Sequence, residues 1–307
     1  KKEIYCKCEK TNNLIHVPKK NINGGLINDY VLIKIFKNKR RIIEGVVEKI
    51  LKRDKEFFVG TFSKKNNTSF VIPIDKNIKT DFYIPRGDCL NAKNNDRVLV
   101  KILEWPEKAK CPFGKITEII GESGDFSTEI LSIIKKHGIE TEFSKESLKY
   151  VKVLNEKIIK RDMENRRDFR EEACFTIDPD DAKDFDDAIS VKKINTNNFE
   201  VGVHIADVSH YVKPNTALDN DAIKRGCSVY LADRVIPMLP EKLANKLCSL
   251  RPNEEKLCFS MVFIINTSGE IISDWLGKTI IKSKKRFTYN EAQNVLNNKQ
   301  GEFFEEL

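Results

Sequence analysis

An internal repeat occupies the first 120 residues. Three segments recur in the same order at an offset of 67 to 69 residues, pairing 15–18 with 82–85, 28–35 with 95–102, and 45–50 with 114–119. A repeat of this length indicates two copies of one small domain in tandem. Short apolar runs separated by Asn, Asp, Gly and Lys predict strands, so each copy should be an all-β unit.

The repeat region is also basic. Residues 1–120 contain 26 Lys or Arg and 14 Asp or Glu, a net charge of +12, while the remaining residues net −4 and the whole chain +8. A basic unit with short strands is typical of OB-type barrels, which bind single strands by stacking bases on aromatic side chains beside a cationic groove. Lys-rich surfaces are also often only solvated, so charge alone leaves a nucleic-acid partner open.

Aromatic residues of the second copy are candidate contacts for such a strand. Alternate residues of a strand point inward, so half or more of these side chains should lie in the core instead. The candidates are Phe57, Phe58, Phe62, Phe70, Phe82 and Tyr83.

Four regions follow along the chain. We expect a first OB domain over 1–50, a second over 51–122, a helical connector over 123–170 and a further domain over 171–307. The first copy has fewer residues before its first repeated segment than the second, so its opening strands should be missing. In the connector, Asp125 or Ser127 can cap a helix that ends at Gly138. The charged stretch that follows it predicts a solvated linker, with a nucleic-acid contact as the alternative, and contains Arg161, Arg166, Arg167 and Arg170.

The cysteines and the apolar runs bear on the cell compartment. The eight cysteines form no CxxC pair and no Cys/His set at zinc spacing, which favours reduced thiols in a cytoplasm. No stretch approaches the roughly 18 apolar residues that a membrane span needs. We therefore expect a cytoplasmic protein without a membrane segment.

A cluster of aspartates lies between two apolar runs. Six aspartates and a single lysine, Lys183, fall within residues 178–187. Like charges held close together repel and raise one another's pKa, so a fold keeps them when a cation neutralises them. All-oxygen ligands select Mg²⁺, Mn²⁺ or Ca²⁺ over zinc. Ala182 and Lys183 stand where an EF-hand loop needs an oxygen ligand and a glycine, so Mg²⁺ chemistry on a phosphate is the better fit. A surface acidic turn is the alternative.

Six ordered motifs resemble the RNase II/RNase R family of processive 3′→5′ exoribonucleases. The tight Asp-Ala-Lys-Asp-Phe-Asp-Asp form of the first motif is more similar to RNase R than to RNase II, and the two β units are similar to the family's tandem cold-shock (OB) domains. The motifs are TIDPDDAKDFDDA (176–188), HIADVSHYV (204–212), RGCSVY (225–230), VIPMLP (235–240), LCSL (247–250) and RFTYNE (286–291).

The resemblance implies a fold and an activity. The fold is tandem OB-type (cold-shock) β-barrels followed by the N-terminal half of a mixed α/β RNB nuclease domain. The activity is Mg²⁺-dependent hydrolysis of RNA from its 3′ end, releasing 5′-nucleotides by two-metal chemistry, with Mn²⁺ as a possible replacement for Mg²⁺. The implied partner is single-stranded RNA, and the full-length form is implied to be a monomer.

The resemblance also assigns residues. Asp178, Asp184, Asp186 and Asp187 match the catalytic, metal-holding aspartates of the family, whereas Asp180 and Asp181 do not belong to the four. Tyr230 matches a tyrosine that stacks on bases near the RNA 3′ end, and Tyr289 one that contacts the terminal nucleotides. Thr288 and Glu291 form a capping box, which places Tyr289 at the start of a helix. His204, in an apolar strand, is expected to be a core or channel-wall residue rather than a base.

The chain departs from the family in length. The family's nuclease domain continues well beyond 137 residues and is followed by an S1 domain, so the match covers only the N-terminal part of the nuclease domain. Two functions of different class therefore remain. One is an RNase R-like exoribonuclease or its N-terminal half; the other is a non-catalytic OB-domain RNA-binding protein with a truncated nuclease domain.

Overall fold

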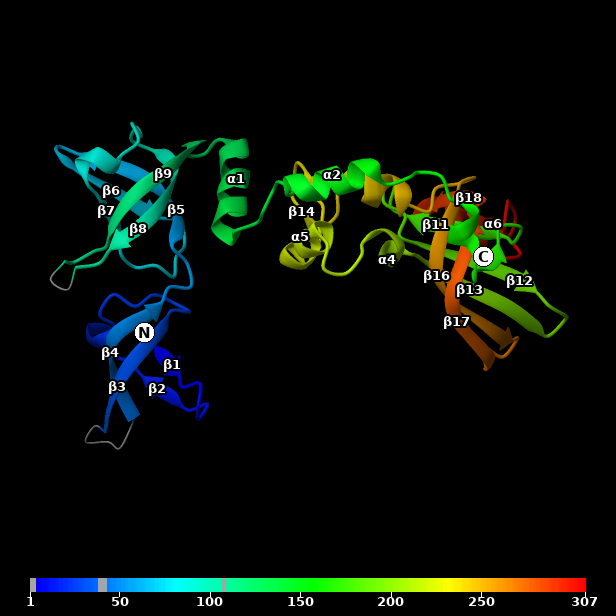
Figure 1. Cartoon of the computed structure of the whole chain (residues 1–307), viewed down its shortest axis with the longest axis horizontal. Coiled ribbons are helices and arrows are strands. Elements are labelled where there is room, and N and C mark those ends of the chain that lie inside the picture. The colour runs from blue at the N-terminus through cyan, green and yellow to red at the C-terminus, as the bar shows by residue number, and fades with distance from the viewer. Residues whose placement is uncertain (1–3, 38–42, 107–108) are drawn as a thin grey trace. The chain divides into compact units, whose positions relative to one another are not determined.

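The computed structural model describes residues 4–37, 43–106 and 109–307. The chain divides into two compact units, Lys1–Ile139 and Glu140–Leu307 (Figure 1). This division falls inside the predicted connector; the predicted boundaries at residues 50, 122 and 170 stay predictions. Among the described residues, no helix is long and apolar enough to cross a membrane.

The first repeat copy forms a four-stranded sheet in the order β1-β2-β4-β3. Among its described residues, the buried apolar side chains are Ile15 of β2, Val17 directly after β2 and Val47 of β4. Its elements are β1 (Tyr5–Lys7), β2 (Leu14–His16), the 3₁₀ turn η1 (Lys19–Asn21), β3 (Tyr30–Lys37) and β4 (Ile43–Lys52).

The second copy is a closed barrel in the order β5-β6-β7-β9-β8. Its core contains Phe62, Phe82, Val98 and Val100, which are all almost completely buried. Its elements are β5 (Phe57–Lys65), β6 (Thr68–Pro73), β7 (Phe82–Ile84), the 3₁₀ turn η2 (Arg86–Asp88), β8 (Asp96–Glu104) and β9 (Phe113–Glu122).

The structure confirms the sequence repeat element by element. Strands β2, β3 and β4 correspond to β7, β8 and β9, and η1 corresponds to η2. Both copies have the same short parallel pairing, His16 with Glu44 and Tyr83 with Phe113. Strand β1 takes the place of β6, but no described strand of the first copy takes the place of β5. Because β5 pairs with both β6 and β8, it closes the second barrel, while the described part of the first sheet stays open.

A capped helix, α1 (Phe126–His137), closes the first unit. The Asp125 side chain accepts a hydrogen bond from the Thr128 amide, and Gly138 adopts the left-handed conformation at φ 64°, as the sequence predicts. Arg97 of β8 donates to both carboxylate oxygens of Glu129 at 3.0 and 3.1 Å. This bidentate ion pair fixes α1 on the barrel.

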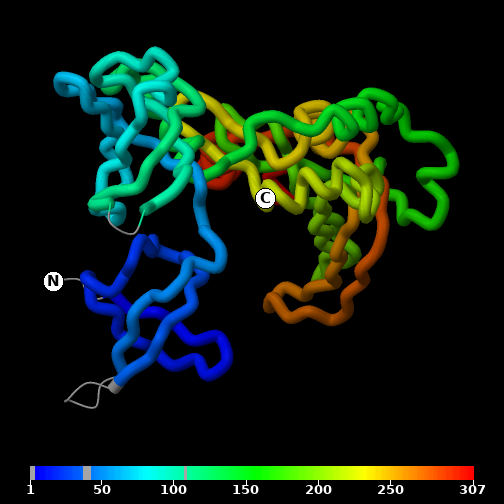
Figure 2. The backbone as a smooth tube through the Cα atoms, turned by 60° about the vertical axis from the view of Figure 1, so that its left-hand side comes forward, coloured from blue at the N-terminus to red at the C-terminus, as the bar shows by residue number. Residues whose placement is uncertain are grey.

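The second unit is built on a seven-stranded mixed sheet in the order β10-β17-β16-β13-β12-β11-β18. Strand pairs β10·β17 and β11·β18 are parallel and the others antiparallel. The long hairpin of β16 and β17 appears in orange in Figure 2. The sheet strands are β10 (Arg167–Phe169), β11 (Cys174–Asp178), β12 (Asp187–Lys193), β13 (Asn198–Ala206), β16 (Glu255–Asn266), β17 (Ile271–Lys282) and β18 (Lys285–Thr288).

Helices and a small ribbon complete the second unit. The mixed α/β architecture agrees with the fold that the sequence predicts. These elements are α2 (Lys145–Val153), α3 (Lys160–Met163), α4 (Val208–Tyr211), α5 (Ala217–Arg225), the ribbon of β14 (Val229–Tyr230) and β15 (Val235–Ile236), the π-helical turn η3 (Leu243–Leu247) and α6 (Tyr289–Asn298).

The two faces of this sheet differ in cover. One face packs against α2, α4, α5 and η3 in the main core, which includes Val151, Tyr211, Leu218 and Leu243. On the other face, α6 packs Ala292 against Phe175 and Phe287. Beyond α6, that face leaves apolar side chains exposed, among them Val203, Ile205, Phe259 and Leu276.

A buried polar chain crosses the middle of the sheet. The two ring nitrogens of His204 lie 2.8 Å from the Ser190 hydroxyl and 2.7 Å from the Ser260 hydroxyl, and Ser260 also contacts Thr279. The ring packs edge-on against Phe169. His204 is therefore a satisfied core residue, as the sequence predicts, and its burial lowers its pKa to about 4.

This histidine should make folding stability depend on pH. The unfolded chain binds a proton at His204 near pH 6.5, whereas the folded chain does so only near pH 4. The contribution of His204 to the free energy of unfolding should therefore fall by roughly 3 kcal/mol in total as the pH drops from about 6.5 to about 4. Urea unfolding of the wild type and of His204→Gln across this range measures it. In the variant, the free energy of unfolding should lose the part of its pH dependence that His204 causes. An identical pH dependence in both proteins would contradict this role of His204.

Candidate active site and nucleic-acid interface

The structure brings the four predicted aspartates to one end of the second-unit sheet. Asp178 ends β11 and Asp187 begins β12, and these two strands are antiparallel neighbours. The connecting loop, residues 179–186, carries Asp184 and Asp186. Asp180 and Asp181 lie on the same loop with exposed side chains, and their exclusion from the four stays a prediction. Adjacent strand ends and one short loop thus place the carboxylates together.

The charges of the aspartates raise one another's pKa values. Asp178 is only 8% exposed, and its burial raises the pKa of its carboxyl, as do the charges of Asp187 and Asp184. The pKa of Asp186 is raised by partial desolvation and by the same set of negative neighbours, although its side chain still reaches solvent. Burial is thus the larger cause of both shifts, and the like charges held close together add to it.

Two contacts fix the ends of the aspartate loop. The Ala206 amide of β13 donates to the Asp186 carbonyl at 3.0 Å. At the other end, the guanidinium of Arg286 on β18 donates to the Pro179 carbonyl and lies 5.7 Å from the centre of the Phe185 ring. Arg286 also lowers the pKa of Asp178 by its positive charge, which opposes the repulsion inside the cluster.

The donor chemistry of the cluster fits a hard divalent cation. Its ligand atoms are all carboxylate oxygens, which Mg²⁺ and Mn²⁺ prefer. The Oδ2 atom of Asp178 is buried and has no hydrogen-bond partner in the structure, so it lacks the partner that a buried polar atom needs. Within the described ranges, however, no three His, Cys, Asp or Glu side chains stand in a ready arrangement around a single metal position. Closing the site on a cation therefore requires adjustment of the exposed loop carboxylates.

Both predicted tyrosines lie beside the aspartates. The phenol of Tyr230, on β14, donates to the Asp184 carboxylate at 3.3 Å, and its side chain is 67% exposed. The charge of Asp184 raises the pKa of this phenol. Tyr289 is the first residue of α6, as its capping box predicts, and is 61% exposed. It lines a groove of about 420 Å³ together with Asp187, Ile177 and Gln293.

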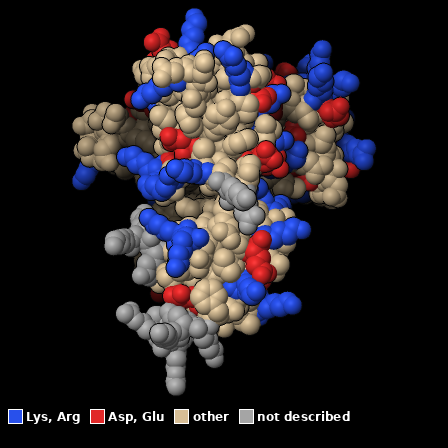
Figure 3. Space-filling model, turned by 90° about the vertical axis from the view of Figure 1, so that its left-hand side faces the viewer, with Lys and Arg blue, Asp and Glu red and all other residues tan. Residues whose placement is uncertain are grey.

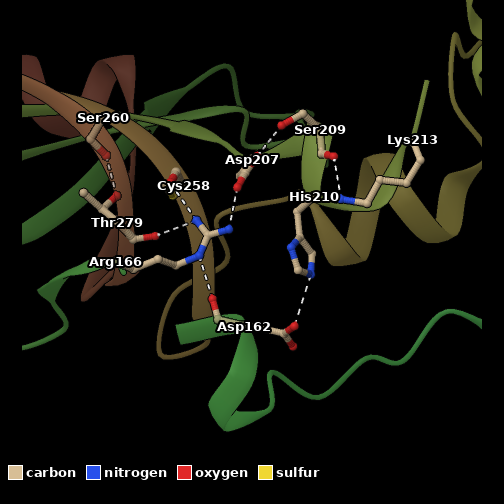
Figure 4. A network of polar contacts seen from close by, with 9 residues as sticks. All are labelled: Asp162, Arg166, Asp207, Ser209, His210, Lys213, Cys258, Ser260 and Thr279. Carbon is tan, nitrogen blue, oxygen red and sulfur yellow. Dashed lines mark hydrogen bonds and ion pairs between the residues drawn. The ribbon is translucent and has the colours of Figure 1, made fainter. Parts of the chain in front are cut away.

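The charged stretch predicted to be a solvated linker is partly core, which corrects the sequence analysis. The Arg166 side chain is 2% exposed. It donates to the Asp207 carboxylate at 2.6 Å and to the carbonyls of Cys258 and Thr279 at 3.1 and 3.2 Å (Figure 4). Burial opposes a charge on Asp207, but hydrogen bonds from Arg166 and Ser209 hold its pKa below the ordinary value.

This buried ion pair supports the aspartate loop. Asp207 directly follows Ala206, whose amide binds the Asp186 carbonyl. Arg166 therefore fixes the end of β13 that contacts the loop. Arg167 is not free in solvent either, since it pairs with Glu200 and lies over the Phe169 and Trp275 rings. Sequence patterns did not separate these two arginines from exposed neighbours, because their carboxylate partners, Asp207 and Glu200, are 33 or more residues away.

The barrel of the first unit carries a strip of aromatic side chains on its outer surface. Phe70 contacts Tyr83 at 5.8 Å between ring centres, and Tyr83 contacts Phe113 at 5.1 Å. All three are half-buried. Phe57, 47% exposed, lies on β5 with the Lys101 ammonium over its ring. Lys and Arg side chains are spread over the face of the molecule shown in Figure 3.

The structure corrects the prediction for Phe58 and adds Phe113. Phe58 is only 8% exposed and packs against Phe82 at 5.2 Å in the barrel core, so it cannot stack on a base. Phe62 and Phe82 are also core residues, as expected for half of the candidates. Phe113 was missed, although it stands at the start of the repeated β9 segment, on the strand that pairs with Tyr83.

Comparison with protein families assigns both parts of the chain. Residues 166–305 match the RNB domain, and residues 70–144 match the cold shock domain. Both matches confirm the resemblance of its sequence motifs to the RNase II/RNase R family.

Individual relatives are ribonucleases R. The Thermotoga maritima protein named Ribonuclease R is 39% identical over 92% of this chain, and Ribonuclease R 2 of Lactococcus lactis is 38% identical over 95%. The solved structure of Mycoplasma genitalium RNase R in complex with ribose-methylated single-stranded RNA superposes with a TM-score of 0.89 at 26% identity over 98% of this chain. The chain spans 40%, 45% and 48% of these three proteins, respectively.

Proposed function

We propose that this chain carries the metal-binding part of an RNase R-like exoribonuclease that hydrolyses RNA from the 3′ end and releases 5′-nucleotides. The observation that carries the proposal is the convergence of Asp178, Asp184, Asp186 and Asp187 at one end of an RNB-domain sheet. The names of the relatives support the same activity.

In this proposal the four carboxylates hold one or two Mg²⁺ ions, with Mn²⁺ as a replacement. A bound divalent ion supplies Lewis-acid activation of the phosphodiester and lowers the pKa of bound water. The protein supplies the negative charge that concentrates the cation, the loop that holds Asp184 and Asp186, and the buried Asp178 carboxylate, whose Oδ2 atom has no hydrogen-bond partner.

The exposed tyrosines are proposed to hold the RNA 3′ end. Tyr230 reaches Asp184 with its phenol, so its ring is free to stack on a base beside the aspartates. Tyr289 and the groove that it lines with Asp187 can receive the terminal nucleotide from the other side. The rings of Tyr230 and Tyr289 are apolar surfaces next to charged aspartates, an arrangement that suits a base joined to a phosphate.

The barrel is proposed to bind single-stranded RNA through its aromatic strip, Phe57, Phe70, Tyr83 and Phe113. The strip is partly exposed, and Lys101 adds positive charge beside it. Stacking on aromatic rings needs unpaired bases, so the proposed ligand is a single strand. A chain that only binds RNA, through this strip, is the alternative function.

Replacing one aspartate separates these functions. Asp186→Asn should lower nucleotide release from a 3′-tailed RNA by at least about a hundredfold, because metal ligation is lost, and should leave RNA affinity nearly unchanged. Asp181→Asn is the matched control, since Asp181 is also an exposed aspartate of the same loop but lies outside the four. Equal loss in both variants would contradict the assignment. A wild-type chain that binds RNA but binds neither Mg²⁺ nor Mn²⁺ would favour the alternative.

RNA binding by the chain should combine stacking with charge. Affinity for single-stranded RNA should fall steeply with salt, by a log–log slope of about −0.7 for each phosphate neutralised. Tyr83→Leu should weaken binding by about 1–3 kcal/mol. Phe126→Leu is the control, because Phe126 is an exposed aromatic on α1, outside the strip. Fluorescence anisotropy at several salt concentrations measures both effects. A flat salt dependence would show that the +12 charge of residues 1–120 is only a solvated surface.

A further inference from the structure

Besides the contacts at its two ends, the backbone of the aspartate loop is also held by hydrogen bonds in its middle, which act as a tether. The Ser249 hydroxyl accepts a hydrogen bond from the Phe185 amide at 3.1 Å and donates to the Lys183 carbonyl at 3.0 Å. The Leu250 amide donates to the Phe185 carbonyl at 2.8 Å. These three bonds enclose Asp184 on both sides and end one residue before Asp186.

The tether itself is anchored in the core. Ser249 and Leu250 are fully buried, and the neighbouring Cys248 is almost so. The Cys248 amide closes the π-helical turn η3 by donating to the Leu243 carbonyl at 2.9 Å. Leu243, Leu247, Cys248 and Leu250 all belong to the main core of the second unit. A rigid, buried segment thus holds an irregular loop at its centre.

We propose that Ser249 is a positioning residue for the carboxylates of Asp184 and Asp186. The proposal rests on the proposed metal binding and gives the motif LCSL, residues 247–250, a physical role. Residues 182–186 form no helix or strand, and the charges they carry repel one another, so nothing regular holds them together. Side chains that hold a metal must be fixed closely in place before the metal arrives.

A serine suits this place because its hydroxyl donates and accepts at once. It satisfies a backbone amide and a backbone carbonyl that flank the same aspartate. An alanine there leaves both backbone groups without this partner while it changes no charge in the cluster. Arg286 and Ala206 hold only Pro179 and Asp186, at the ends of the loop, and cannot replace this contact.

The test measures Mn²⁺ binding to the whole chain, with electron paramagnetic resonance reporting the concentration of free Mn²⁺. Ser249→Ala should weaken Mn²⁺ binding about tenfold, as the loss of a group that orients metal ligands typically does. Ser260→Ala is the matched control: Ser260 is also a fully buried serine with two side-chain partners, but it contacts His204 and Thr279 and not the loop. Asp186→Asn confirms that the Mn²⁺ lies at the aspartates.

The outcomes separate this proposal from the proposed function. A wild-type chain that does not bind Mn²⁺ overturns the function proposed above. Wild-type binding with equal affinities in Ser249→Ala and the wild type, or with equal losses in Ser249→Ala and Ser260→Ala, overturns the role of Ser249 alone. Thermal unfolding of both variants shows whether each is folded during the titration.

A second measurement on the unmodified chain keeps the proposal testable if Ser249→Ala does not fold. The Phe185 amide should exchange with solvent slowly in NMR hydrogen exchange, because Ser249 accepts its hydrogen bond inside the core. The Lys183 amide, for which the structure shows no such contact to Ser249, should exchange faster. Rapid exchange at Phe185 would show that the tether does not form and would overturn the proposal.

Discussion

Electrostatic repulsion among four carboxylates is the constraint on which the second unit depends. Two unit charges 4 Å apart repel by about 4 kcal/mol at an effective dielectric constant of 20. Burial raises the pKa values of Asp178 and Asp186, and the negative charges of the neighbouring aspartates raise them further. The fold holds the carboxylates in place against this repulsion. Asp178 and Asp187 lie on neighbouring strands, and the loop between them is hydrogen-bonded to β13, to β18 and to residues 249–250.

A buried ion pair between Arg166 and Asp207 belongs to the surroundings of the aspartate loop. Arg166 and Asp207 are almost completely buried, which is costly unless their hydrogen bonds are complete. Arg166 donates to three carbonyls and one carboxylate, and Asp207 also accepts from Ser209. Their pairing joins α3, β13, β16 and β17 at the point where β13 meets the aspartate loop. Removing either partner would leave a buried charge next to the site.

Local features of the sequence predicted much of this structure. The structure has the predicted caps at Asp125 and Thr288, the start of α6 at Tyr289 and the grouping of the aspartates, which all depend on residues close together in the chain. Contacts between distant segments were not predictable. The Arg166 side chain meets Asp207, 41 residues away, and Ser249 meets Phe185, 64 residues away. Phe58 and Phe57 are adjacent, and only the register of the barrel decided which one lies inside.

The central claim is that Asp178, Asp184, Asp186 and Asp187 together bind a divalent cation. Its most direct test is a crystal structure of the chain grown with Mn²⁺, with anomalous diffraction data to locate the metal. The account predicts an anomalous peak at the end of β11 and β12, coordinated by oxygens of these aspartates at the 2.0–2.3 Å or so that such ions require. Mn²⁺ bound only elsewhere on the chain, with the four carboxylates unligated, would contradict it.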